Sequence, residues 1–270
     1  MKTDAEFTFP TQFQRKLGQQ DLKYHLSRYT IMKEKGMELF GEALKDFYNG
    51  KKNAEITLIR DDGLEFNVPI VYFFRSPKDF SNLEKEAIQL CKGKVLDMGA
   101  GVGPHSLELQ RLGLEVYAID ISSHACEIMK KRGVKNVQCT DFYNLTMESF
   151  DTILLLGRSI GFVGNLKGIK KFLSYCKTRL NPEGIIILDS IDFRLTQEQV
   201  HLNYMERNRK LGRYISEGSL QMKYKNTLGD KFQNVQIDPN TLKKITQELG
   251  LSCKILCKEE DGMYLAKIST

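Results

Sequence analysis

A glycine-rich loop after a short apolar stretch is the part of this 270-residue sequence best suited to hold a ligand. Residues 95–104 read Val-Leu-Asp-Met-Gly-Ala-Gly-Val-Gly-Pro, so that Asp97 is followed by Gly99, Gly101 and Gly103 at every second position. Glycines let the backbone approach a ligand that side chains would exclude, and the helix that follows offers free N–H groups to a carboxylate or phosphate. The segment therefore predicts a nucleotide-type ligand at the end of a buried strand.

Two further acids follow apolar stretches in the same way. The stretch 116–119 ends at Asp120, and the stretch 137–139 leads to Asp141. A carboxylate at the end of a strand can accept hydrogen bonds from both hydroxyls of a ribose. Aspartate also caps helices and occupies turns, which is the plainer interpretation of each acid. Ser123 offers another cap for the helix after Asp120, which favours the ligand interpretation there.

Two ligand classes compete for this loop. A dinucleotide-binding loop has the pattern Gly-x-Gly-x-x-Gly, and here Pro104 stands in place of the third glycine. The observed Asp-x-Gly-x-Gly-x-Gly instead resembles the first motif of class I S-adenosylmethionine-dependent methyltransferases, and Asp120 and Asp141 resemble the acids of the second and third motifs. The resemblance covers residues 94–190 well and 239–270 loosely. It implies S-adenosyl-L-methionine as the cofactor and S-adenosyl-L-homocysteine as the product.

The resemblance also implies a role for each motif. Asp97 and the glycines would surround the amino acid part of the cofactor, Asp120 would bind the ribose and Asp141 the adenine amino group. The end of the strand 151–156 would lie beside the transferred methyl group, and we expect no metal site. The residues expected to contact the cofactor, including two aromatics that could fold over it, are Asp97, Gly99, Ala100, Gly101, Gly103, Asp120, Ile121, Asp141, Phe142, Leu156, Gly157, Tyr72 and Phe73.

No catalytic residue is obligatory in such an enzyme, because the protein mainly aligns the acceptor with the methyl group and excludes water. A general base is needed only for a hydroxyl or a protonated amine. The candidates for a catalytic role are His105, Arg158 and Tyr204. Arg158 either attracts an anionic part of a substrate or pairs with a nearby acid. Residues 156–159 read Leu-Gly-Arg-Ser, unlike the Asn-Pro-Pro-Tyr of the family's nucleobase- and protein-methylating members.

The elements that must position these residues alternate regularly from residue 94 onward. Short apolar strands separated by amphipathic helices predict a parallel sheet covered on both faces, and right-handed crossovers make it doubly wound. The predicted fold is α/β, with a mostly parallel seven-stranded sheet of the Rossmann-like methyltransferase type. The strands expected in the core are 94–98, 115–119, 136–139, 151–156 and 184–188.

The rest of the chain is expected to extend and cover this core. In the insertion, strands at 214–224 and 231–237 are predicted to join at a turn formed by Gly229 and Asp230. A polar arm is predicted before the first helix. The four expected parts are an N-terminal helix and hairpin extension that contributes to the cap (1–92), the cofactor-binding core (93–190), an inserted cap with the substrate region (191–238), and a helix and hairpin that complete the core sheet (239–270).

Composition favours a folded protein, since 41% of the residues are apolar and 27% are charged. No apolar run approaches the ~18 residues of a membrane span, and residues 1–9 do not resemble a signal peptide, so we expect a cytoplasmic protein without a membrane partner. The net charge of +6 is modest, which disfavours a nucleic-acid partner but leaves it open. The six cysteines form no Cys-x-x-Cys and are expected to be reduced core residues, with Cys253 and Cys257 on one face of a strand.

The expected function is methyl transfer from S-adenosylmethionine to an oxygen or nitrogen of a small molecule. A lid beside a compact core is typical of an enclosed small-molecule pocket. One rival is an RNA or protein methyltransferase that docks through its basic helices. Rivals from another class are a dinucleotide-binding and a non-catalytic Rossmann-like protein. A monomer and a homodimer fit the sequence equally.

Overall fold

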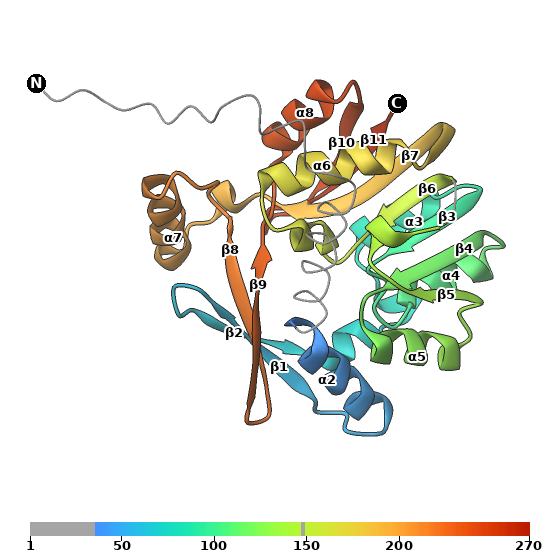
Figure 1. Ribbon diagram of the computed structural model, residues 1–270, viewed down its shortest axis with the longest axis horizontal. Helices are drawn as coiled ribbons and strands as arrows, with labels where there is room; N and C mark the ends of the chain where they lie inside the picture. Colours follow the sequence, from blue (N-terminus) through green and yellow to red (C-terminus); the bar gives the residue numbers. More distant parts are fainter. Residues whose placement is uncertain (1–35, 147–148) are drawn as a thin grey trace, which may run out of the picture.

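The computed structural model describes residues 36–146 and 149–270, and the predicted polar arm before residue 36 lies outside the described residues. The larger of two sheets has seven strands in the order β10-β11-β7-β6-β3-β4-β5 (Figure 1). Six strands run in one direction, and β11 runs antiparallel to both of its neighbours. This confirms the predicted α/β fold. The strands are β3 Lys94–Met98, β4 Glu115–Asp120, β5 Asn136–Cys139, β6 Phe150–Leu155, β7 Leu180–Ile191, β10 Ser252–Lys258 and β11 Met263–Ser269.

Helices cover both faces of this sheet because its strands present apolar side chains to both sides. In β3, Leu96 belongs to an apolar cluster with Phe172 on one face of the sheet. The adjacent residue Val95 points to the other face and belongs to a cluster with Leu109. Among the described helices, none is long and apolar enough to cross a membrane. One face carries α6 Leu166–Lys177 and α8 Pro239–Glu248, and the other carries α3 Asn82–Leu90, α4 Pro104–Arg111 and α5 Ser123–Arg132.

The smaller sheet is antiparallel and joins two hairpins that are far apart in the sequence. Its strand order is β2-β1-β8-β9, and Thr57 of β1 pairs with Lys223 of β8. Figure 1 shows it beside the larger sheet, with α2 (Glu38–Tyr48) next to it. The buried Phe40 and Leu44 of α2 belong to the same apolar cluster as Ile56 and Met222 of this sheet. Hence the N-terminal extension and the insertion together make one cap. Its strands are β1 Glu55–Arg60, β2 Glu65–Pro69, β8 Gly218–Tyr224 and β9 Thr227–Asn234, preceded in the insertion by α7 Gln199–Lys210.

The turn between β8 and β9 lies four residues earlier than the sequence suggested. Tyr224 pairs with Thr227, so the chain turns at the two residues between them, where Lys225 has a left-handed φ of 54°. Gly229 lies inside β9, where a Cβ atom would come 3.2 Å from Cδ1 of Leu39 on α2. The predicted turn at this glycine is therefore wrong, and its small size instead permits the close packing of α2.

The cysteines also depart from the prediction. All six are free, but Cys139 is exposed at the end of β5, so it is not a core residue. Cys253 pairs with Ile268 and Cys257 with Leu265, and these two partners belong to clusters on opposite faces of the sheet. A bulge just before Cys257 shifts the alternation of β10, so the two thiols do not share a face.

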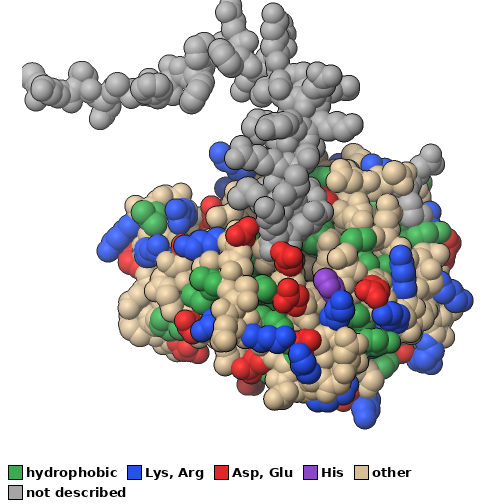
Figure 2. Space-filling model, turned by 60° about the horizontal axis from the view of Figure 1, so that its bottom comes forward, with side chains coloured by type: hydrophobic (Ala, Val, Ile, Leu, Met, Phe, Trp, Pro, Cys, Tyr) green, Lys and Arg blue, Asp and Glu red, His purple; other side chains and the backbone are tan. Residues whose placement is uncertain are grey.

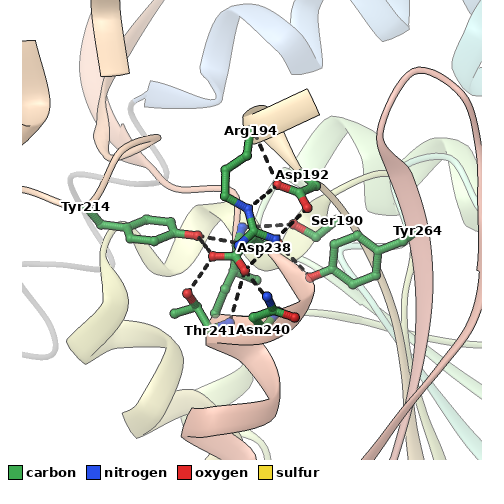
Figure 3. A network of polar contacts seen from close by, with 9 residues as sticks. Ser190, Asp192, Arg194, Tyr214, Asp238, Asn240, Thr241 and Tyr264 are labelled. Carbon is green, nitrogen blue, oxygen red and sulfur yellow. Dashed lines mark hydrogen bonds and ion pairs between the residues drawn. The ribbon is translucent and has the colours of Figure 1, made fainter. Parts of the chain in front are cut away.

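A polar network fixes the cap to the core where β9 leads into α8 (Figure 3). The Arg194 guanidinium contacts Asp192 at 2.7 Å and Asp238 at 3.0 Å, and the Tyr214 hydroxyl donates to Asp238. The Tyr264 hydroxyl, from β11, donates to the backbone carbonyl just before Asp238 at 2.6 Å. Arg194 joins the two ends of the insertion to each other, and Tyr264 ties them to the core, so the smaller sheet is held over the carboxyl edge of the larger one.

Candidate active site

A cavity of about 690 Å³ lies between the carboxyl ends of the core strands and the inner face of the smaller sheet. Its volume is within the ~300–1,000 Å³ of typical ligand pockets. Every residue expected to contact the cofactor lines it except Gly103, and so do His105, Arg158 and Tyr204. The opposite wall is apolar and is formed by Phe40, Ile56, Leu58, Phe66, Val68, Leu220, Met222 and Phe232.

The glycine-rich loop turns between β3 and α4 with three left-handed residues. The φ angles of Gly99, Gly101 and Gly103 are 69°, 58° and 75°. The N–H groups of Gly99 and Ala100 donate to the carbonyl of Ile119, which ties the loop to β4. A Cβ atom on Gly101 would meet nothing within 4 Å, so this glycine leaves open space beside the cavity. The loop can therefore accept a ligand against its backbone.

Two buried carboxylates stand beside this loop. Asp97 accepts a hydrogen bond from the Ser106 hydroxyl, and burial raises the pKa of Asp97. Asp120 accepts from the Gly101 N–H at 2.9 Å and from the Ser122 N–H at 2.8 Å. Burial raises the pKa of Asp120 to about 6, although these backbone bonds oppose the shift. A carboxylate can accept about four hydrogen bonds, so Asp120 keeps acceptor capacity for a hydroxyl donor.

The third acid lies next to an aromatic surface. Asp141 caps the short helix η4 (Phe142–Asn144) by accepting the Tyr143 N–H at 2.9 Å. The ring of Phe142 meets Phe172 edge-on, with 4.6 Å between ring centroids. Phe142 and Ile121 both line the cavity, so the acid and the apolar surfaces fit a flat heterocycle.

A buried ionic cluster supports the rim between Tyr72 and His105. Glu84 accepts two bonds from Arg75, at 2.7 and 3.0 Å, one from His105 Nε2 at 2.8 Å and one from the Ser81 N–H at 2.8 Å. The Arg75 guanidinium lies 3.6 Å from the Tyr72 ring centroid. Burial pushes the pKa of Glu84 up, but the bonds from His105 and Ser81 and the charges of His105 and Arg75 lower it to about 2. An ionised carboxylate can only accept hydrogen bonds, so Nε2 of His105 must carry the proton in this contact. Nδ1 is then the ring nitrogen that does not contact Glu84.

The segment after β6 is held from both sides. The carboxylate of Asp189, on β7, accepts the N–H groups of Gly157 and Arg158 at 3.0 and 2.7 Å, and Gln236 Nε2 donates to the Arg158 carbonyl at 3.3 Å. Arg158 has a left-handed φ of 59°, which costs a non-glycine residue ~1–2 kcal/mol. Burial raises the pKa of Asp189 to about 6. Strained residues that their surroundings hold in place are often functional.

On the cap side, the polar groups are already engaged with each other. The Tyr204 hydroxyl donates to Asp61 at 2.7 Å, and burial, with this acid, raises the pKa of Tyr204. The Arg60 guanidinium lies 3.9 Å from the Tyr204 ring centroid and forms two bonds to Asp62. Arg60 also contacts Nδ1 of His201 at 3.0 Å, and since a guanidinium only donates, Nδ1 must be the acceptor. The Tyr204 hydroxyl therefore has a structural partner.

Sequence reasoning missed Asp189 and Gln236, which hold the segment after β6, and of these two Gln236 lines the cavity. Asp189 follows the apolar run 185–188, which is the same pattern that singled out Asp97 and Asp120, so a local signal existed. Gln236 had no comparable signal, because it reaches the cavity only through the packing of the cap. Conversely, Gly103 lies behind the loop, where a Cβ atom would come 2.8 Å from Cγ2 of Val134.

Comparison with known proteins places this geometry in a family. The family described as "Methyltransferase domain" matches residues 96–188. A solved structure of a SAM-dependent methyltransferase from Bacteroides fragilis, in complex with S-adenosyl-L-homocysteine, is 32% identical and superposes with a TM-score of 0.75. The alignment covers 87% of this chain and 95% of that one.

Two curated relatives are similar over shorter stretches. The glycine/sarcosine N-methyltransferase of Halorhodospira halochloris is 34% identical over 109 residues, which are 37% of this chain and 40% of that protein. The ubiquinone biosynthesis O-methyltransferase of Pasteurella multocida is 25% identical over 130 residues, which are 43% of this chain and 54% of that protein. The matches thus span about half or less of these two relatives. Because the full-length similarity to the Bacteroides protein agrees with the family match and with the fold, the chain belongs to the S-adenosylmethionine-dependent methyltransferases.

Proposed function

We propose that this protein transfers a methyl group to an oxygen or nitrogen of a small-molecule acceptor. The observation that carries the proposal is the cavity, which joins the glycine-rich loop to an apolar wall supplied by the cap. A concave site between two sheets suits a small acceptor, because its walls can cover most of such a molecule. The glycine/sarcosine and ubiquinone-biosynthesis enzymes similar to this chain support a small acceptor.

The residues around the loop fit the cofactor of the family. The open space at Gly101 suits an amino acid portion lying against the backbone, and the free lone pairs of Asp120 suit a ribose. Asp141 and Phe142 offer a carboxylate and an aromatic face to an adenine. When bound, the cofactor supplies a methyl group on a positively charged sulfur.

The protein's own part is to orient the acceptor and to manage its proton. His105 lines the cavity, and the Glu84 carboxylate holds its Nε2–H, so Nδ1 is the nitrogen that can accept a proton from a hydroxyl or ammonium group. Tyr204 is less suited to this task, since its hydroxyl already donates to Asp61. We therefore assign the base role, where the acceptor needs one, to His105.

The surface gives less support to an RNA or protein acceptor. On the face drawn in Figure 2, lysines and arginines are interspersed with acids and form no continuous basic stripe over the drawn residues. A docking face for RNA needs clustered positive charge. Family membership, with Pro104 in place of the third glycine, also argues against a dinucleotide ligand.

The test is a titration with S-adenosylhomocysteine, followed by a screen of small metabolites and of bulk tRNA with S-adenosylmethionine. Formation of S-adenosylhomocysteine reports methyl transfer for any acceptor. We expect micromolar binding and turnover with a metabolite. Absence of binding would contradict the proposal, and turnover with tRNA alone would favour the RNA alternative.

A matched pair of alanine variants separates the two roles of the loop. Both Gly101→Ala and Gly103→Ala place a side chain at positive φ, at a cost of ~1–2 kcal/mol. At Gly103 the Cβ would also press against Val134 and Met129, and overpacking adds ~1–3 kcal/mol. Thermal melting should therefore show the greater loss of stability for Gly103→Ala. Titration should show that Gly101→Ala loses more S-adenosylhomocysteine affinity than Gly103→Ala does for each degree by which its melting temperature falls. The reverse order would be inconsistent with the placement of these glycines.

Affinity for S-adenosylhomocysteine is expected to fall as the pH drops below 6. A ribose hydroxyl donates best to an ionised carboxylate, and Asp120 takes up a proton near its raised pKa of about 6. Near pH 5, Asp120 is ionised in only about a tenth of the protein molecules. The dissociation constant at pH 5 should therefore be ~tenfold higher than at pH 7.5. The Asp120→Asn variant should bind weakly at both pH values. A pH-independent affinity in the unchanged protein would rule out this role of Asp120.

A further inference from the structure

The positive charges that line the cavity differ in whether they are neutralised. Arg60 forms an ion pair with Asp62 at 2.7 Å, and Arg75 forms one with Glu84 at 2.7 Å. Arg158 also lines the cavity, yet no carboxylate lies within 4 Å of its guanidinium in residues 36–146 and 149–270. Of the three cavity arginines, Arg158 is thus the one whose charge is left available.

The backbone around Arg158 shows that this position is built rather than loose. The two oxygens of Asp189 accept the N–H groups of Gly157 and Arg158, and this carboxylate forms no ion pair with the Arg158 guanidinium, so it holds the main chain and not the side chain. Gln236 holds the Arg158 carbonyl, and Gln236 in turn accepts from the buried Ser190 hydroxyl at 3.1 Å. The arginine is therefore presented from a fixed left-handed turn, which reduces the entropy lost when it binds an anion.

The wall facing the core supplies a second feature, which is apolar. Phe66 and Tyr72 line the cavity and keep 39% and 44% of their surface exposed, so aromatic area is available to a ligand. Met222 and Phe232 continue this wall from β8 and β9. A ligand that fits both features has an apolar body and one acidic group.

We propose that Arg158 binds an acidic group of the methyl acceptor, and that the acceptor is a small amphipathic acid whose apolar body lies against the smaller sheet. The proposal rests on the proposed function, since it names the acceptor class for the same cavity. The segment that carries Arg158 follows β6, whose end we expect beside the transferred methyl group. An acid held there sets which atom of the acceptor faces the methyl group. The planar guanidinium of an arginine can form two parallel hydrogen bonds to two oxygens of either a carboxylate or a phosphate.

Matched probes test the charge directly. The protein is first saturated with S-adenosylhomocysteine and then titrated by calorimetry with 4-hydroxyphenylacetate, its neutral amide 4-hydroxyphenylacetamide, and 4-hydroxybenzylphosphonate. We expect at least one of the two acids to bind at least ~tenfold more tightly than the amide. Whether the carboxylate or the phosphonate binds more tightly identifies the acidic group.

Variants then assign the preference to Arg158. Arg158→Met should bind the preferred acid and the amide with nearly equal affinity, Arg158→Lys should keep part of the preference, and Arg209→Met, on the exposed face of α7, should behave like the unchanged protein. Three results would overturn the proposal: equal binding of acids and amide by the unchanged protein, no binding of any probe up to ~10 mM, or a loss of S-adenosylhomocysteine affinity in Arg158→Met as large as the loss for the acid. The last result would mean that Arg158 binds the cofactor's carboxylate. Failure of the initial saturation instead refutes the function on which the proposal rests, and it is observed before any probe is added.

Discussion

In the Asp120→Ala variant, S-adenosylhomocysteine is expected to bind at least ~100-fold more weakly than in the unchanged protein. The carboxylate is buried and already positioned by the N–H groups of Gly101 and Ser122, so binding a ribose requires no rearrangement of it. Hydrogen bonds to a charged group contribute ~1.5–3 kcal/mol each, and a ribose offers two hydroxyls. Isothermal titration near pH 7.5, well above the pKa of Asp120, measures the difference.

A ligand analogue distinguishes a lost contact from a distorted loop. The 2′,3′-dideoxy analogue of S-adenosylhomocysteine should bind the unchanged protein weakly, and Asp120→Ala should lower its affinity little further, because the hydroxyls are absent in both cases. Circular dichroism and melting temperature should remain close to those of the unchanged protein. If the variant weakens both ligands equally, Asp120 acts through the Gly101 loop and not on the ribose.

The core could be predicted because its signals are local. The strands β3, β4 and β6 are short and largely apolar, and Asp97 and Asp120 lie at the ends of the first two. Glycines with positive φ follow Asp97 closely, and the helix after Asp120 is capped by Ser122, one residue before the predicted cap Ser123. Strand, loop and cap thus lie within about ten residues of each other, and their spacing alone indicates that the acids meet at one edge of the sheet.

The cap could be predicted only in part, because its pairing is not local. Both hairpins were recognisable, but no sequence pattern indicated that Thr57 and Lys223 pair across more than 160 residues. Glycine favours turns, which predicts a turn at Gly229, whereas in the structure this glycine makes room for Leu39. A bulge such as the one before Cys257 likewise shifts the alternation without any marker in the sequence.

The same distinction applies to the site. Residues on the glycine-rich loop and at the ends of the first core strands were predicted to surround the ligand, and with the exception of Gly103 they line the cavity. The partners that decide which of them are free for a ligand could not be read from the sequence. The sequence allows Arg158 either to bind an anion or to pair with an acid, and only the positions of Asp189 and Gln236 show that its backbone, rather than its side chain, is engaged.

The Glu84→Gln variant is expected to lower the melting temperature by ~6–12 °C, corresponding to a loss of at least ~3 kcal/mol. Glu84 is buried, and its carboxylate is the acceptor in all four of its hydrogen bonds. Two of these bonds come from Arg75, one from His105 and one from the Ser81 N–H. An amide of the same shape must turn its NH₂ group toward some of these donors, and it leaves the Arg75 charge without a counter-ion. The change is small in volume, so the expected loss is electrostatic rather than steric.

Differential scanning calorimetry at neutral pH measures this effect, and hydrogen exchange locates it. Exchange should increase in residues 70–75, because Arg75 is released from Glu84 and no longer holds the Tyr72 ring. Glu127→Gln is the matched control, since it removes a carboxylate from an exposed pair with Lys131, where solvent screens the interaction and little stability is lost. If Glu84→Gln melts within ~2 °C of this control, the cluster is not an ionic support, and the assignment of His105 as a base held by Glu84 loses its foundation.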